Sequence, residues 1–195
     1  MIQKIKLHFN FKSIILSLIL ALITTFGLIW LLLQPPVVGG DFELSHRGTP
    51  WKFSDHAKKL NLLYIGYVKC PDVCPFSLAA ARDAFDKLSD EEKTKVQLIF
   101  ISVDAAHDTA QSVADYASAF NPGFIGLTGS KQQVDLVIQQ FGASYVVENE
   151  PKSYLGYSIA HTDKVFFLRR KGYVVETIHH PRESEPIVET IRRAL

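Results

Sequence analysis

The sequence is poor in cysteine: it has only Cys70 and Cys74 in 195 residues. Two cysteines so close together enclose too short a loop to stabilise a fold much, so a disulfide scaffold is excluded. An iron–sulfur cluster usually needs about four cysteines, and a structural zinc site needs about four cysteine or histidine ligands. In an oxidising compartment, an isolated close pair therefore indicates redox chemistry or a metal site with few ligands.

Acidic residues and arginine are absent from the start of the chain. No acidic residue precedes Asp41, and residues 1–12 contain no arginine. Mitochondrial transit peptides are typically rich in arginine, so this leader favours a bacterial inner membrane over a mitochondrial one. The chain also has no basic stripe, and its formal net charge is only +1. We therefore expect no nucleic-acid partner.

What the N-terminal part does contain is one long apolar run, residues 13–33, without any charge. About 20 apolar residues suffice to cross a bilayer as a helix. The lysines before the run place the N-terminus in the cytoplasm by the positive-inside rule. A cleaved signal peptide is the alternative, but its apolar stretch is shorter and a small-x-small site follows it. We expect a cytoplasmic leader (1–12), a single transmembrane anchor (13–33), a linker (34–40) and a folded domain (41–195) in the periplasm or cell exterior.

The folded domain shows alternating strand and helix patterns. Residues 62–68 and 96–103 are continuous apolar runs, typical of central strands covered on both faces. A helical pattern reaches about Leu88 between them, which implies parallel strands joined by a crossover. Further segments are expected to be a hairpin at 42–44 and 51–53, helices starting at Asp108 and Ser130 with capping boxes, strands at 144–147, 154–160, 165–168 and 173–178, and a last helix from about Glu185. The pattern predicts a thioredoxin-like α/β sandwich.

The cysteines lie between the first central strand and the following helix, in the order Cys70-Pro71-Asp72-Val73-Cys74-Pro75. Proline suits the first turn of a helix, so Cys74 should lie at or beside the N-cap and Cys70 in the preceding loop. The positive end of a helix favours thiolates. The spacing allows either a disulfide or two sulfurs on one metal. Two thiolates and one imidazole would suit Cu(I), and also Cu(II) if a further ligand is found.

The residues alone do not choose the imidazole. The chain has seven histidines, and a solvated surface side chain is the usual role for each. One, His8, lies in the leader. The other candidates are His46, His56, His107, His161, His179 and His180.

Taken together, the segment that contains both cysteines and several other segments resemble the Sco/SenC copper-chaperone family, which assembles the copper centre of cytochrome c oxidase. The matching segments are spread over residues 39–170, at 39–44, 66–75, 102–109, 125–129 and 157–168. The resemblance implies a thioredoxin fold and a copper site formed by Cys70, Cys74 and His161. It also implies a partner, the copper-bearing subunit of the oxidase. The alternative role is a thiol–disulfide oxidoreductase that reduces that subunit's cysteines, and enzymatic activity is expected only in that role.

Two positions depart from the family pattern. Val68 stands where the family usually has threonine, and His107 stands where it usually has arginine. The change to histidine removes a guanidinium fork, which imidazole replaces only partly and only when protonated. Asp72, between the cysteines, fits two interpretations equally: a carboxylate that acts near the metal or on a partner, or a simple turn residue.

Overall fold

The computed structural model describes residues 11–33 and 37–195, and the chain divides into two units, residues 1–36 and 37–195. The predicted leader and part of the predicted linker lie outside the described residues. In the first unit, helix α1 spans Phe11–Leu32. Its stretch Lys12–Leu32 has a mean hydropathy of 2.6 and no buried residues. By length and composition, α1 could cross a membrane once.

Three hydroxyl groups in the middle of α1 form hydrogen bonds within the helix. Ser17, Thr24 and Thr25 donate to backbone carbonyls three or four residues earlier, at 2.8–3.0 Å. An unpaired hydroxyl would be costly to place in hydrocarbon. These three hydroxyl side chains are therefore compatible with an apolar surrounding.

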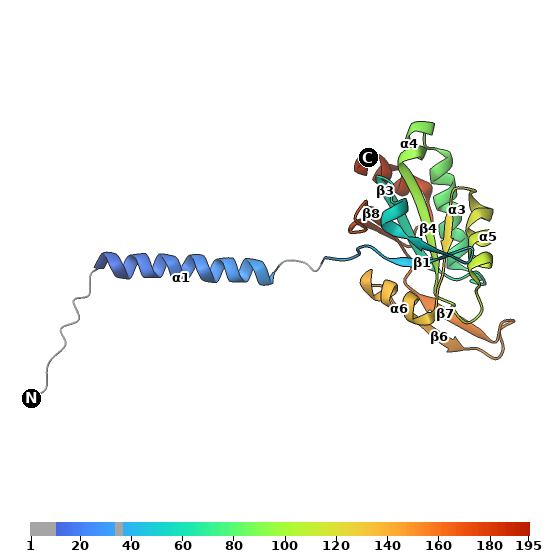
Figure 1. The fold of residues 1–195 in the computed structure, drawn as a ribbon, viewed down its shortest axis with the longest axis horizontal. Helices are drawn as coiled ribbons and strands as arrows, with labels where there is room; N and C mark the ends of the chain where they lie inside the picture. The colour runs from blue at the N-terminus through green and yellow to red at the C-terminus, as the bar shows by residue number, and fades with distance from the viewer. Residues whose placement is uncertain (1–10, 34–36) are drawn as a thin grey trace, which may run out of the picture. The chain divides into compact units, whose positions relative to one another are not determined.

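The second unit is a mixed α/β domain (Figure 1). Its strands are β1 (Glu43–His46), β2 (Thr49–Lys52), β3 (Leu60–Gly66), β4 (Val96–Ser102), β5 (Ile125–Leu127), β6 (Tyr145–Asn149), β7 (Tyr157–His161), β8 (Lys164–Arg169) and β9 (Val174–His179). Its helices are α2 (Phe53–His56), α3 (Val73–Asp86), α4 (Asp90–Lys95), α5 (Ala110–Phe120), α6 (Lys131–Gln140) and α7 (Ser184–Ala194).

A five-stranded sheet in the order β5-β4-β3-β8-β9 forms the centre of the domain. Strands β3, β4 and β5 are parallel, while β8 and β9 are antiparallel to their neighbours. Every residue of β3 and β4 is buried, as their continuous apolar runs predicted. The thioredoxin-like fold, with its crossover and closing hairpin, is thereby confirmed.

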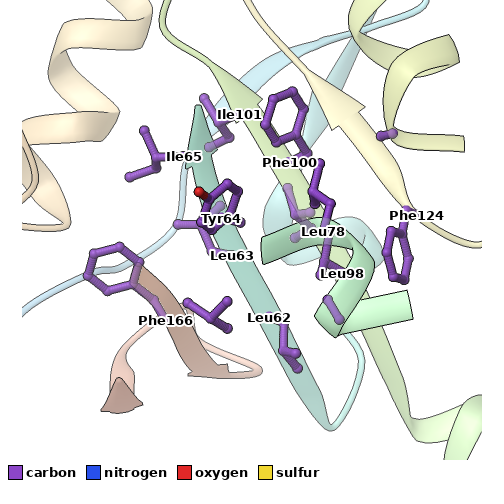
Figure 2. Packing of buried hydrophobic residues seen from close by; sticks show 14 of the residues in the cluster. Leu62, Leu63, Tyr64, Ile65, Leu78, Leu98, Phe100, Ile101, Phe124 and Phe166 are labelled. Carbon is purple, nitrogen blue, oxygen red and sulfur yellow. The ribbon is translucent and has the colours of Figure 1, made fainter. Parts of the chain in front are cut away.

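Side chains of the central strands alternate between two packed layers (Figure 2). On one face, Leu62 and Leu98 lie near Leu78 of α3, and α3 in turn packs against α5 and α7. On the other face, the core includes an aromatic group formed by Phe42, Phe141 and Phe166, whose neighbouring ring centroids are 5.7 and 6.0 Å apart. Both faces of the sheet are therefore covered, and the segment between Gly66 and Val73, here called the cysteine loop, begins where the central strand β3 ends.

Several boundaries differ from the expectations; β3, for example, spans Leu60–Gly66 and not residues 62–68. Phe53 begins the short helix α2 instead of ending a strand. The strand predicted from residue 154 begins at Tyr157, because residues 150–156 form a turn that includes Pro151 and ends in Gly156 at φ +77°. Helix α5 is capped by Thr109, whose hydroxyl accepts from the Ser112 backbone N–H. The capping box predicted at Ser130 is confirmed.

Candidate metal centre

The cysteine loop turns directly from β3 into α3. Helix α3 begins at Val73 after the N-cap Asp72, so Cys74 is the second helical residue, two positions after the cap and not at or beside it as predicted. Pro75 lies in the first turn, as predicted. Asp72 is exposed and is the N-cap, but its side chain makes no capping hydrogen bond. Cys70 precedes the helix, and its backbone N–H donates to Tyr67 O at 3.3 Å.

The two thiols differ in exposure and in the space around them. Cys74 is fully buried, whereas Cys70 retains 9% of its surface, and both are free thiols. The sulfur of Cys74 fills space that only a glycine leaves open at the end of β3. A Cβ added at Gly66 would lie 2.5 Å from Cys74 Sγ and 3.0 Å from the ring of Phe100.

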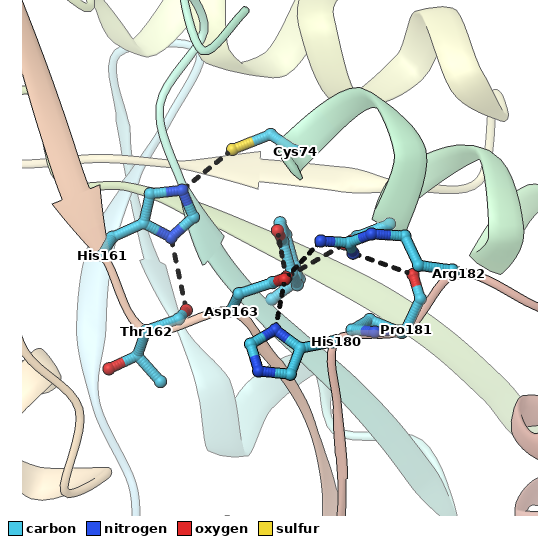
Figure 3. A network of polar contacts seen from close by, with 9 residues as sticks. Cys74, His161, Thr162, Asp163, His180, Pro181 and Arg182 are labelled. Carbon is cyan, nitrogen blue, oxygen red and sulfur yellow. Dashed lines mark hydrogen bonds and ion pairs between the residues drawn. The ribbon is translucent and has the colours of Figure 1, made fainter. Parts of the chain in front are cut away.

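His161 ends β7 and points its ring at the cysteines. Its Nε2 lies 3.3 Å from Cys74 Sγ, and its Nδ1 lies 3.3 Å from Thr162 O (Figure 3). When Nδ1–H donates to that carbonyl, the lone pair of Nε2 faces the sulfur. The rings of Tyr64 and Tyr67 are nearly perpendicular to the imidazole, with centroid distances of 6.3 and 6.0 Å. The imidazole thus packs between a carbonyl, a thiol and two aromatic rings.

The structure therefore brings together the three side chains that the sequence singled out. The ligand atoms of Cys70, Cys74 and His161 all lie within 4.8 Å of one another. Two sulfurs and one nitrogen at this separation can share one soft ion, since metal–sulfur and metal–nitrogen bonds are about 2.0–2.3 Å long. In the two described ranges, this is the one group of three such side chains that meets the geometry of a metal site.

The two sulfurs also differ in acidity. Hydrogen bonding from Cys74 lowers the pKa of Cys70 to about 4, with further help from His161 and from backbone N–H groups at the start of α3. Burial raises the pKa of Cys74 well above its ordinary value. The two shifts favour a thiolate on the more exposed Cys70 over one on the buried Cys74.

A buried carboxylate next to the imidazole was not predicted. Asp163 accepts from Tyr64 Oη at 2.9 Å, from Ser77 Oγ at 3.1 Å, and from Arg182 at 2.6 Å, and its other contact is His180 Nδ1 at 3.1 Å (Figure 3). Burial raises the pKa of Asp163, but these hydrogen bonds lower it by more. The network ties the turn after His161 to α3, the helix that carries Cys74. In the sequence, Asp163 stands between Thr162 and Lys164, where an acid carries no special signal.

The other described histidines do not face the cysteines. One of them, His107, contacts Asp104. His46 Nδ1 lies 2.9 Å from Gly126 O, and the ring of His56 stacks on Trp51 at 4.9 Å. His179 is exposed, and His180 contacts Asp163. These side chains lie outside the cysteine–histidine group, and His8 lies outside the described residues.

The chain is similar in sequence and in fold to known proteins. The family model described as SCO1/SenC matches residues 32–195. The mitochondrial SCO2 homolog of Mus musculus is 33% identical over 164 residues, which cover 82% of this chain but 63% of that protein. The solution structure of apo Sco1 from Thermus thermophilus has a TM-score of 0.73 and 30% identity, covering 83% of this chain and 94% of that one. The crystal structure of copper-bound ScoI from Arabidopsis thaliana has a TM-score of 0.70 and 28% identity, covering 80% and 97%.

Proposed function

Because the chain belongs to the SCO1/SenC family, we propose that it is a membrane-anchored copper metallochaperone. It binds copper as cargo through Cys70, Cys74 and His161 and delivers it to the copper centre of cytochrome c oxidase, whose copper-bearing subunit is its partner. The single observation that supports this most is the convergence of the three ligand atoms within 4.8 Å.

The chemistry of the three side chains suits transfer better than storage. Thiolates are soft ligands that select Cu(I), and an imidazole also suits copper. A three-ligand site leaves room for an incoming ligand from an acceptor. Cys70 keeps some exposure and lies in the loop before α3, whereas Cys74 is enclosed. An acceptor sulfur would therefore reach the metal from the Cys70 side.

We propose that helix α1 anchors the domain to a membrane, so that copper exchange takes place there. We propose that residues 1–12 are cytoplasmic, that residues 13–33 span a bacterial inner membrane, and that residues 34–40 link the span to the copper-binding domain, 41–195, outside. The lysines before the span support this orientation. Protease added to intact spheroplasts should remove the domain and leave the leader protected. Protection of the domain would reverse the proposed orientation.

Copper binding is tested on the reduced full chain in detergent, loaded without oxygen against a competing Cu(I) chelator. We expect about one equivalent of copper. Cys70→Ser, Cys74→Ser and His161→Ala should each weaken binding by at least about tenfold, since each removes one of three ligands. Unchanged affinity in the His161→Ala chain would contradict the proposed site.

A second function, thiol–disulfide oxidoreductase, is favoured by the two free thiols of Cys70 and Cys74, whose sulfurs lie within 4.8 Å of each other. The lowered pKa of Cys70 favours a thiolate there, the form that attacks disulfides. Attack on a partner disulfide would form a mixed disulfide and release a partner thiolate, and Cys74 would then displace the second partner sulfur as a Cys70–Cys74 disulfide forms. The His161→Ala chain separates the two roles: a reductase keeps much of its exchange rate, whereas a chaperone loses copper.

A further inference from the structure

The strand that carries His161 is not part of the central sheet. Within the described residues, β7 forms its backbone ladder with β6 alone, as a two-stranded hairpin. Most of β6 is exposed on both faces. A hairpin of two strands is only marginally stable by itself. The position of His161 relative to the cysteines therefore depends on side chains that fasten β7 to the rest of the domain.

At the opposite end of β7, Tyr157 makes such a connection. Its hydroxyl donates to Asp104 Oδ2 at 2.6 Å. The second oxygen of that carboxylate, Oδ1, lies 2.8 Å from His107 Nδ1. The rings of His107 and Tyr157 stack, with centroids 4.6 Å apart and an interplanar angle of 15°. Three side chains from two distant segments thus form a closed set of contacts.

The same loop also holds the cysteine side of the site. Four residues after Asp104, Asp108 Oδ2 accepts from the backbone N–H of Val68 at 2.9 Å and from Ser102 Oγ at 2.5 Å. Val68 lies two residues before Cys70. The loop between β4 and α5 therefore contacts both sides of the site. Asp108 binds the cysteine loop through Val68, and Asp104 binds β7 through Tyr157.

We propose that Asp104, His107 and Tyr157 form a latch that positions His161 for copper binding. Tyr157 and His161 are four residues apart on one strand, so their side chains share a face, and fixing one limits the movement of the other. Asp104 is 4% exposed, so losing a donor leaves a buried carboxylate oxygen unpaired. The imidazole of His107 also stacks on the ring of Tyr157, so each residue of the latch contacts the other two. This inference rests on the proposed copper function.

The test compares Tyr157→Phe and His107→Ala with matched controls in the reduced full chain. Tyr154→Phe is the control for the tyrosine, because Tyr154 lies in the same β6–β7 connection and is fully exposed. His179→Ala is the control for the histidine. We expect both latch variants to lose at least about tenfold in Cu(I) affinity, as loss of a group that orients a metal ligand does, and both controls to stay within about twofold of the wild type.

Two further measurements separate positioning from general destabilisation. The nitrogen hyperfine coupling in the Cu(II) electron paramagnetic resonance spectrum should weaken in the latch variants, because it reports His161 on the metal. His107→Arg should keep the Cu(I) affinity that His107→Ala loses, since a guanidinium both stacks on tyrosine and donates to a carboxylate. The double variant should lose less than the product of the single losses, because both contacts share Asp104.

The outcomes distinguish this inference from the proposed function. If the wild type binds copper, loses it in His161→Ala and is unaffected by His107→Ala and Tyr157→Phe, the latch is wrong and the function stands. Equal losses in the latch variants and their controls also overturn the latch. If the wild type binds no copper, the proposed function fails first.

Discussion

Gly66 lies so close to Cys74 that a methyl group on its α-carbon would sit 2.5 Å from the cysteine sulfur. We expect Gly66→Ala to push this sulfur away from Cys70 and His161, and to lower Cu(I) affinity by at least about tenfold. Overpacking a rigid core typically costs about 1–3 kcal/mol of unfolding free energy. Chelator competition and urea denaturation measure the two effects.

The control for this substitution is Gly123→Ala, because the nearest atom to a Cβ there is the flexible Asn121 side chain at 3.2 Å. It should leave copper affinity unchanged. Wild-type affinity in Gly66→Ala would show that the sulfur has room to move.

The hydrogen bond between the cysteines predicts the pH dependence of Cys70. With a pKa of about 4, the metal-free reduced protein should react with iodoacetamide at Cys70 at a nearly constant rate from pH 6 to 8. Cys74→Ala removes the largest cause of the lowered pKa, so the reaction should become slower at pH 6 and rise with pH. A steep rise in the wild type over this range would contradict the assignment.

The same pKa shift affects stability with a defined sign. The folded-state pKa of Cys70 lies below that of an unfolded cysteine, so its contribution is fully present above the unfolded value of about 8.5. It is lost as the pH falls toward 4. The difference in unfolding free energy between wild type and Cys70→Ala should therefore shrink from pH 8.5 to pH 4. A difference that does not change with pH would contradict this linkage.

The buried Asp163 network should matter more than a surface ion pair. Asp163→Ala leaves Tyr64 and Ser77 without their acceptor and Arg182 without its ion partner, so we expect a loss of about 2–4 kcal/mol in unfolding free energy. The control is Asp83→Ala, which removes the exposed Arg82–Asp83 pair and should cost at most about 1 kcal/mol. Similar small losses in urea denaturation would show that the network contributes little.

Because Asp108 is buried, we expect its negative charge to lower the free energy of unfolding. Desolvation raises its pKa above the ordinary value despite the hydrogen bonds from Ser102 and Val68. A raised folded-state pKa gives stability at low pH that is lost as the carboxyl ionises. Asp108→Asn keeps an acceptor without the charge, so it should match or exceed the wild type in unfolding free energy at pH 7.

The comparison for Asp108 is Asp108→Ala, which removes the acceptor as well. It should lose about 1–3 kcal/mol, because the buried backbone N–H of Val68 is left unpaired. If the asparagine variant were as unstable as the alanine variant at pH 7, the charge itself would be required.

The parts of the fold that sequence predicts are those set by local pattern. Continuous apolar runs identified β3 and β4, and Pro75 predicted the start of α3 to within one helical turn. The fold and the family followed from such segments. The start of α5 was missed by one residue, because Asp108 binds the distant Val68 instead of capping the helix.

The site was predictable only in part. The cysteine pair was visible from its spacing, but the choice of His161 among seven histidines needed the family resemblance. The unequal acidity of the sulfurs was not predictable, since it depends on how deeply each is buried. The contact between Asp104 and Tyr157 spans 53 positions, and no local sequence pattern in either segment predicts it.

The distance along the chain between Cys74 and His161 is 87 positions, and in the proposed orientation the exported segment emerges from its N-terminal side. Both sulfurs would reach the exterior well before the imidazole does. A nascent or truncated chain would then offer only a dithiol, and the third ligand would arrive with the last third of the domain. If the chain has the proposed function and orientation, tight copper binding would require completed synthesis, and immature chains would not be loaded prematurely.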